Sequence, residues 1–382
     1  MGGWAGPTLL GPGTEQGGRT LAWSYNGIYQ LTNETITGDP ANSNGNNGYA
    51  SYTLDPVGNR TAATSTFSGF TPVFGSYNLN DQLSGETYDS NGNVTRTANG
   101  NNYIYDSENH MISMSNSTTS VTMKYDAFGN RVSKAVTTAG VTTTTQYLVE
   151  DDVNPTGYAQ VIEELTGPIG SAAVQRTYTY GLQRISQDQY ISNAWLLSYY
   201  QYDGGSVRQL TNSTGQVTDS YEYDAFGNDV YHTGTTPNNY LYRGEQYDSD
   251  LGLYYLRARY YNPATGRFMS RDPNNPGSTD ATGTPIDPRE LHKYLYAGGD
   301  PVNRVDPRGR AELFEYSLVT GGSKLGVMDY VLSKAGLTVA LCFYGVARTL
   351  YTIAHDQSFW NDLDGGAAVV GCAIMFPLPP VT

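Results

Sequence analysis

Short stretches in which polar and aromatic residues alternate recur along most of the chain. Residues 177–180 read Thr-Tyr-Thr-Tyr, and residues 220–223 read Ser-Tyr-Glu-Tyr. Residues two apart point to the same face of a strand, so this alternation gathers tyrosines on one face. Stretches rich in Gly, Asn and Ser, such as 42–48, are typical of loops. The pattern predicts a mainly β protein built from antiparallel hairpins.

The dipeptide Tyr-Asp marks a repeating unit. It occurs at 88–89, 105–106, 125–126, 202–203, 223–224 and 247–248. Two copies extend to Tyr-Asp-Ala-Phe-Gly-Asn, with the turn positions Tyr125, Asp126, Gly129 and Asn130 in one and Tyr223, Asp224, Gly227 and Asn228 in the other. Aspartate starts a turn through its side chain, glycine supplies a positive φ, and asparagine tolerates a left-handed conformation. Each unit is therefore expected to form strand, tight turn and strand.

Stacked hairpins bury a tyrosine-bearing face that a single hairpin leaves exposed. We therefore expect a long, twisted antiparallel sheet that coils upon itself. In this interpretation the tyrosines pack and the aspartates form turns. The alternative is that rows of exposed tyrosines bind carbohydrate.

The pattern changes after residue 310. The segment 311–382 has no Tyr-Asp unit and contains two apolar stretches, 337–353 and 365–376. The first has an arginine inside it and is shorter than the about 20 residues of a membrane span, so a buried helix is favoured over a transmembrane one. The adjacent His355 and Asp356 hint at a nuclease or hydrolase centre in this tail.

Composition narrows the class of protein. The 382 residues include 33 Tyr and 44 Gly, which disfavours both an all-helical bundle and a disordered chain. The net charge of −14 disfavours nucleic-acid binding through the repeats. Both cysteines, Cys342 and Cys372, lie near the C-terminus, and the four histidines lack metal-ligand spacing. We predict no metal and no cofactor, and no signal peptide is visible in residues 1–7.

Two long segments resemble a known family. Residues 242–273 (YRGEQYDSDLGLYYLRARYYNPATGRFMSRDP) and 294–309 (YLYAGGDPVNRVDPRG) resemble the signature of the Rhs repeat-associated core domain. The Tyr-Asp units resemble the YD repeats of Rhs proteins, which include bacterial polymorphic toxins, toxin-complex C subunits and, more distantly, teneurins. The resemblance covers about residues 20–310.

The resemblance implies a spiral β-sheet that forms a hollow shell, a core domain that plugs one end, and a variable effector that follows. It implies a YD-repeat region at 1–239, a core domain at 240–310 and a variable tail at 311–382 that is an effector remnant. A complete shell needs more repeats than this chain has. We therefore interpret the chain as the C-terminal part of a shell, or as a short degenerate copy.

The resemblance also implies a reaction. The family's core domain can act as a self-cleaving aspartyl protease, and its two Asp-Pro positions correspond to Asp272 and Asp306 here. The implied cleavage site is the bond between Arg310 and Ala311. Two close carboxylates that share a proton can activate water and protonate the leaving group. The first motif is less compact than the family pattern, and Arg310 replaces the usual leucine, so simple Asp-Pro corners remain the alternative.

The arginines of the core-domain signature have a structural interpretation. Arg257, Arg259 and Arg267 are expected either to pair with carboxylates in the plug or, as the favoured interpretation, to be solvated.

The implied function is an encapsulating scaffold that contains and presents a C-terminal effector in interbacterial competition or toxin delivery. Its implied partners are its own tail as cargo, a secretion-apparatus spike or toxin-complex subunit, and an immunity protein. The expected location is secreted or on the cell surface, as part of a larger protein. An enzymatic activity would be at most self-cleavage. The alternatives are a cell-surface adhesion or carbohydrate-binding repeat protein and an inactive fragment of a larger Rhs protein.

Overall fold

The computed structural model describes residues 13–14, 19–38, 47–69, 71–152, 154, 156, 158–168, 170–273, 292–310 and 313–314. The chain divides into two units, Met1–Glu312 and Leu313–Thr382. In the second unit the structure describes β25 (Leu313–Phe314). The expected tail helix, the two cysteines and the His355–Asp356 pair lie outside the described residues.

A five-stranded sheet begins the first unit. Its order is β1-β2-β3-β4-β5, and every neighbouring pair is antiparallel. The strands are β1 (Gly13–Thr14), β2 (Thr20–Tyr25), β3 (Leu31–Thr37), β4 (Gly48–Leu54) and β5 (Arg60–Ser65).

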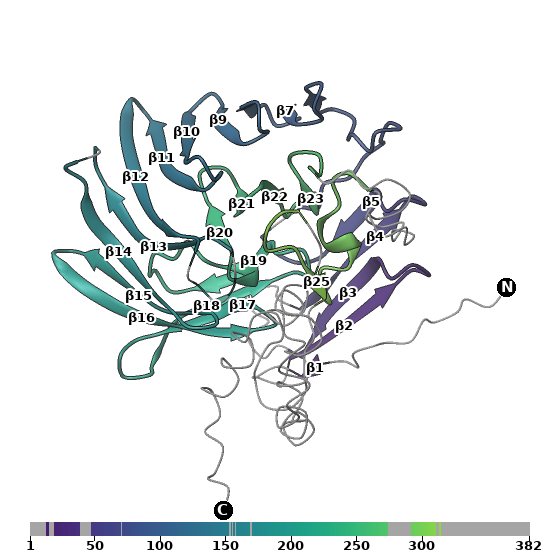
Figure 1. The fold of residues 1–382 in the computed structure, drawn as a ribbon. Coiled ribbons are helices and arrows are strands. Elements are labelled where there is room, and N and C mark those ends of the chain that lie inside the picture. The colour runs from purple at the N-terminus through teal and green to yellow at the C-terminus, as the bar shows by residue number, and fades with distance from the viewer. Residues whose placement is uncertain are drawn as a thin grey trace, which may run out of the picture. The chain divides into compact units, whose positions relative to one another are not determined.

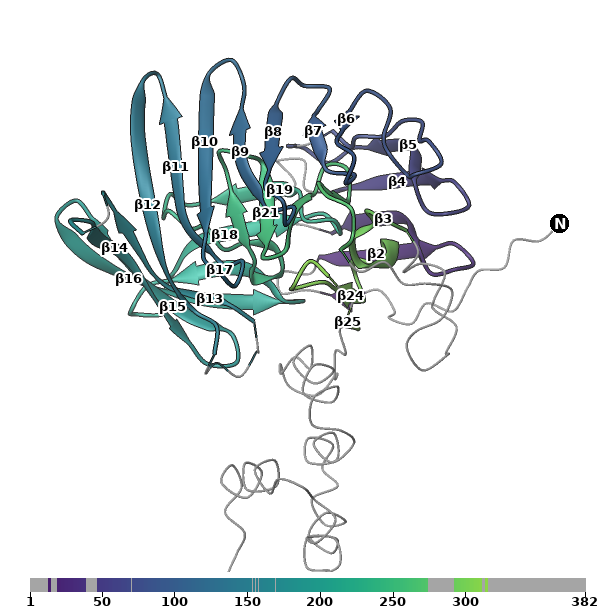
Figure 2. The same cartoon turned by 45° about the horizontal axis from the view of Figure 1, so that its top comes forward.

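A fourteen-stranded sheet follows, and each strand pairs with the next one in the sequence. Figure 2 shows this sheet as a continuous curved wall. Its strands are β6 (Thr87–Tyr88), β7 (Val94–Arg96), β8 (Asn102–Tyr105), β9 (Met111–Ser115), β10 (Thr119–Tyr125), β11 (Arg131–Thr138), β12 (Val141–Glu150), β13 (Gln160–Thr166), β14 (Ala173–Tyr180), β15 (Arg184–Ile191), β16 (Ala194–Asp203), β17 (Ser206–Thr211), β18 (Val217–Tyr223) and β19 (Asp229–Thr233).

Four short strands form an inner sheet, which we call the plug. They are β20 (Gln246–Asp248), β21 (Leu253–Leu256), β22 (Arg259–Asn262) and β23 (Arg267–Phe268). The 3₁₀ turns η2 (Tyr242–Gly244) and η4 (Tyr296–Gly299) and strand β24 (Arg304–Val305) complete this region. In Figure 1 the fourteen-stranded sheet bends round the plug.

The core lies between the plug and the two larger sheets. One cluster packs Leu210 of β17 against Tyr254 of β21, and a second packs Met114 of β9 against Leu253. A third joins Leu31 of β3 to Phe226, in the turn after β18. The tyrosines supply much of this core, because a strand face dense in tyrosine buries large apolar rings. The largest fully buried side chains include Tyr254, Tyr261, Tyr294 and Tyr296.

One turn geometry recurs between strands. The first residue donates its N–H to the carbonyl of the residue four positions later and accepts the N–H of the residue three positions later. That third-following residue has a positive φ, as a type I turn with a bulge requires. The first residues of these turns are Asn26, Asp55, Asn78, Asp89, Thr97, Asp106, Asp126, Asn212, Asp224 and Leu241.

The expected mainly β, antiparallel hairpin architecture is confirmed. The boundaries at 239/240 and 310/311 stay predictions. Within the part of the chain that the structure describes, no helix is long and apolar enough to cross a membrane.

Candidate functional site

Arg259 occupies the centre of the candidate site. It begins β22, directly after the tight turn Arg257-Ala258 that joins β21 to β22. Its guanidinium lies over the ring of Phe268, 3.6 Å from the ring centroid. Tyr and Leu residues flank the turn on both sides and draw it into the core. An arginine buried in this way needs carboxylate partners.

Both candidate aspartates converge on one nitrogen of Arg259. Nη2 lies 2.8 Å from Oδ2 of Asp272 and 3.3 Å from Oδ2 of Asp306. The side chain of Asp306 is 2% exposed and that of Asp272 is 22% exposed. Burial lowers the pKa of Arg259, and the two carboxylates offset part of that shift. The structure therefore brings together two carboxylates that are 34 positions apart in the sequence.

The segment after Asp306 folds back onto the same arginine. Oδ1 of Asp306 accepts the N–H of Arg310 at 3.0 Å, and Nε of Arg259 donates to the carbonyl of Gly309 at 2.5 Å. Gly309 has a φ of +62°, and a Cβ there would lie 2.6 Å from the carbonyl oxygen of Leu256. Only glycine fits this approach. Arg310 is therefore anchored through its N–H, whereas Ala311 lies outside the described residues.

The other two arginines that the sequence analysis named, Arg257 and Arg267, also have partners. Arg267 is buried and donates to Oδ1 of Asn59. Arg257 pairs with Glu245 at 2.8 Å. The favoured interpretation of solvated arginines is therefore wrong, because Arg259 and Arg267 are buried and Arg257, with a side chain 20% exposed, pairs with Glu245.

The eight repeat-turn positions form two turns with matching hydrogen bonds. Oδ1 of Asp126 accepts the N–H of Phe128 and of Asn130, both at 2.9 Å. Oδ1 of Asp224 accepts the N–H of Phe226 at 3.1 Å and of Asn228 at 2.7 Å. Gly129 has a φ of +82° and Gly227 a φ of +92°. Tyr125 ends β10 and Tyr223 ends β18, and Asn130 and Asn228 close the two turns.

Two Tyr-Asp copies depart from this turn. Asp203 is followed by a two-residue turn, Gly204-Gly205, where Asp203 pairs with Ser206. The carboxylate of Asp248 pairs instead with Arg131 and Lys134 of β11. Burial alone would raise the pKa of Asp248, but Arg131 and Lys134 lower it below its ordinary value. Asp248 thus fastens the plug to the wall.

Sequence reasoning missed three features of the site. It gave no specific partner to Arg259, did not single out Glu245, and did not find the turns that begin with Asn or Thr. The apolar residues on both sides of 257–259 are a signal of burial, and Asn-x-x-x-Gln is a signal of the turn at 26–30, 78–82 and 212–216. The structure shows no cluster of three His, Cys, Asp or Glu side chains suited to a metal among the described residues.

Comparisons with known proteins identify the repeat architecture. The Teneurin YD-shell family model matches residues 41–302. The chain is 33% identical over 272 residues to a tRNA nuclease, WapA, of Bacillus subtilis strain 168, a match that covers 68% of this chain and 11% of WapA. It is 24% identical over 286 residues to double-stranded DNA deaminase toxin A of Burkholderia cenocepacia, covering 65% of this chain and 19% of that toxin.

Two solved structures share the fold. TcdB2-TccC3-TEV gives a TM-score of 0.58 at 20% identity, over 76% of this chain and 15% of that chain. The Photorhabdus luminescens Tc holotoxin pore gives 0.58 at 19% identity, over 81% of this chain and 16% of that chain. The chain thus spans between 11% and 19% of the length of these four proteins. The family model covers more than half of it, and the chain belongs to the Teneurin YD-shell family, as its Rhs-like YD repeats predicted.

Proposed function

We propose that this chain is the closing part of a YD-repeat shell that contains and presents the segment after residue 310, and that Asp272 and Asp306 cut the chain between Arg310 and Ala311. The observation that supports cleavage most directly is the convergence of both aspartates on Nη2 of Arg259, beside the anchored segment 306–310. The fold supports the shell.

The two carboxylates differ in exposure, and our proposal gives them different roles. Asp306 is buried and accepts N–H groups from Arg259 and Arg310, and in this proposal it acts as the base. Asp272 is partly exposed, and in this proposal it acts as the acid. Water attacks the carbonyl carbon of Arg310 and gives a proton to Asp306. The C–N bond then breaks, and the nitrogen of Ala311 takes a proton from Asp272.

The names of the relatives support an effector role for the tail. A tRNA nuclease, a DNA deaminase toxin and a toxin-complex subunit all share this repeat architecture. In this proposal the segment 311–382 is the cargo, and a secretion-apparatus spike or toxin-complex subunit delivers the shell. An immunity protein protects the producing cell. The shell acts outside the cell or at its surface.

Intact-mass measurement of the purified chain tests the cleavage. We expect a fragment ending at Arg310, which is lost in Asp306→Asn and in Asp272→Asn. Asp287→Asn is the matched control, because Asp287 also precedes a proline and should leave cleavage intact. A wild-type chain that stays full length over days would refute self-cleavage.

Expression of residues 311–382 in the bacterial cytoplasm tests the cargo. Growth arrest supports an effector, whereas normal growth at confirmed expression contradicts a bacterial target.

A second candidate function is carbohydrate binding. Tyr190 and Trp195 form a cross-strand pair at the end of the β15–β16 hairpin, with ring centroids 5.6 Å apart and exposures of 40% and 49%. Exposed aromatic rings of this kind bind sugar faces. A glycan array compares the wild type with Trp195→Ala; binding lost in the variant favours adhesion, and no binding by the wild type removes this candidate.

A further inference from the structure

Arg257 connects three parts of the molecule. Its Nε donates to the carbonyl of Ala159, just before β13, at 3.0 Å. Its Nη1 lies 2.8 Å from Oε2 of Glu245 and also donates to the carbonyl of Pro307. The guanidinium stacks on the ring of Tyr158 at 4.2 Å. One side chain thus links the sheet wall, the plug and the Asp306 segment.

Glu245 holds this arginine in place. It follows η2, and its N–H donates to the carbonyl of Tyr242 at 3.0 Å, which fixes its backbone. Its side chain is buried. Burial raises the pKa of Glu245, and Arg257 offsets part of that shift. The pair therefore stabilises two charges that would be costly to bury separately.

Three successive residues of the plug turn bind three successive carbonyls of the segment. Arg257 binds Pro307, the N–H of Ala258 donates to Arg308 at 3.3 Å, and Nε of Arg259 donates to Gly309 at 2.5 Å. A backbone held at each residue has little freedom to shift. The next peptide bond along the chain is the proposed cleavage site.

We propose that Arg257, held by Glu245, is a positioning residue for self-cleavage: it fixes the Pro307 carbonyl and so sets where the Arg310–Ala311 bond lies relative to Asp272 and Asp306. This inference rests on the proposed function. Arg257 also binds Ala159, so the same side chain joins this segment to the wall beside β13.

Lysine cannot replace this arginine. An ammonium is a point charge, whereas the planar guanidinium spans acceptors on Ala159, Glu245 and Pro307. A misplacement of about 1 Å slows a reaction by about 100-fold. We therefore expect cleavage in Arg257→Lys to slow by about that factor.

The experiment measures the first-order rate at which the 1–310 fragment appears after the full-length chain is refolded. The variants are Arg257→Lys and Glu245→Gln, and the matched control is Arg243→Lys. Arg243 also has a positive φ and binds backbone carbonyls, but those of Gly204, Pro301 and Val302. We expect both test variants to cleave slowly and the control to cleave at the wild-type rate. Wild-type rates in Arg257→Lys, or equal slowing in the control, would overturn the proposal.

Chemical rescue separates positioning from general stability. Arg257 has a φ of +58°, so Arg257→Gly leaves the turn unstrained and creates a space shaped for a guanidinium. Millimolar guanidinium should restore part of its cleavage rate and should not accelerate Arg243→Gly. Failure of the guanidinium ion to accelerate Arg257→Gly, in a variant that folds, contradicts the proposal.

We call the contact of Arg257 with the Pro307 carbonyl the clamp. Limited trypsin digestion tests the clamp independently of self-cleavage. Trypsin cuts after arginine, and Arg308 and Arg310 lie in the segment 306–310. In the Asp272→Asn chain, which should not cleave itself, the rate of trypsin cleavage therefore reports how tightly this segment is held. Adding Arg257→Lys should increase nicking after Arg308, whereas Arg243→Lys should not. If the wild-type chain does not cleave itself but Arg257→Lys still increases trypsin cleavage after Arg308, self-cleavage is refuted and the clamp is supported. An unchanged nicking rate refutes the clamp.

Discussion

Two turns share the six-residue sequence Tyr-Asp-Ala-Phe-Gly-Asn and differ in what surrounds them. Both make the same aspartate-centred hydrogen bonds. Phe128 in the first turn is 84% exposed, whereas Phe226 in the second is 5% exposed. Local sequence therefore sets the shape of the turn, and the tertiary structure sets its role.

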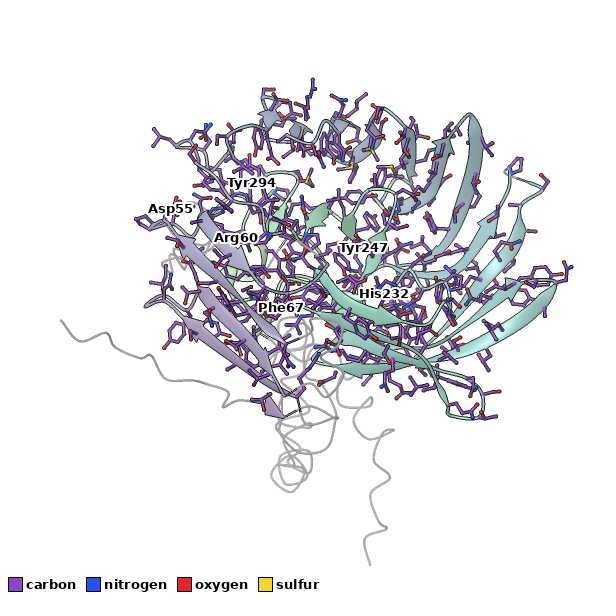
Figure 3. The ribbon with its side chains drawn as sticks, turned by 180° about the vertical axis from the view of Figure 1, so that it is seen from behind. Asp55, Arg60, Phe67, His232, Tyr247 and Tyr294 are labelled. Atoms are coloured by element: carbon purple, nitrogen blue, oxygen red, sulfur yellow. The ribbon has the colours of Figure 1, made fainter. Side chains whose placement is uncertain are left out.

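The buried turn joins the first sheet to the rest of the first unit. The rings of Phe226 and Tyr52 meet edge to face at 5.2 Å, and the guanidinium of Arg60 lies 4.6 Å from the Phe226 ring. Arg60 also donates to the carbonyl of Ala264, and it extends from the first sheet toward the plug (Figure 3). Glu34 accepts the N–H of Ala225 at 2.8 Å. The same six residues act here as a docking element.

Truncating Phe128 and Phe226 should give the largest difference in unfolding free energy between the two turns. Phe226→Ala removes a buried ring and should cost about 3–5 kcal/mol of unfolding free energy. Phe128→Ala should change it by less than about 0.5 kcal/mol, since the ring is mostly in solvent. Urea unfolding followed by tryptophan fluorescence measures both. Equal effects would show that the second turn is not a docking element.

Replacing the two glycines with alanine should give the next largest difference. Both have positive φ, so each alanine costs about 1–2 kcal/mol in backbone strain. A Cβ at Gly227 would also lie 2.5 Å from Cδ1 of Tyr242, whereas one at Gly129 would lie 3.0 Å from Nε2 of His110. Overpacking against the buried tyrosine adds about 1–3 kcal/mol. Thermal unfolding of Gly227→Ala and Gly129→Ala tests the order, and a more stable Gly227→Ala would contradict it.

Removing the two aspartates tests the turn hydrogen bonds themselves. Asp224→Ala leaves the N–H groups of Phe226 and Asn228 without their acceptor in the core, at about 1–3 kcal/mol for a buried group. In Asp126→Ala the freed N–H groups can bond to water, so about 1 kcal/mol is expected. Denaturation midpoints compare the two variants. A similar loss in both would mean that burial adds nothing to the aspartate's role.

The smallest expected effect is a pH dependence of stability that comes from the buried turn. Burial raises the pKa of Asp224 to about 6, although hydrogen bonds donated by Asn228 and the charge of Arg60 oppose this shift. Burial together with the charge of Asp224 also raises the pKa of Glu34. The folded protein therefore holds protons that the unfolded chain releases. The stability from Asp224 is present below its ordinary pKa and is lost as pH rises toward and through about 6.

Urea midpoints between pH 4 and 7 measure how steeply stability falls with pH in the wild type and in Asp224→Asn. We expect the stability of Asp224→Asn to decrease less with rising pH than that of the wild type. Identical slopes in the two proteins would contradict the assignment.

Much of the fold was predictable because it is local. Alternating tyrosines predicted strands, and Asp-x-x-Gly-Asn predicted the turn, since both depend on residues within one hairpin. The resemblance named Asp272 and Asp306, and their catalytic role stays a prediction. That Arg259 lies between them could not be predicted, because the contact depends on how β22, the chain after β23 and the chain after β24 pack.

The sequence by itself determined the hairpin unit, the antiparallel order of neighbouring strands and the membership of the repeat family. Each rests on short-range rules or on a long motif. The tertiary structure alone decided which of two like-sequence turns is buried, that Asp248 pairs with Arg131, and that Arg257 clamps Pro307. These contacts join residues that are far apart in the chain, and only the packing of the plug against the sheets selects them.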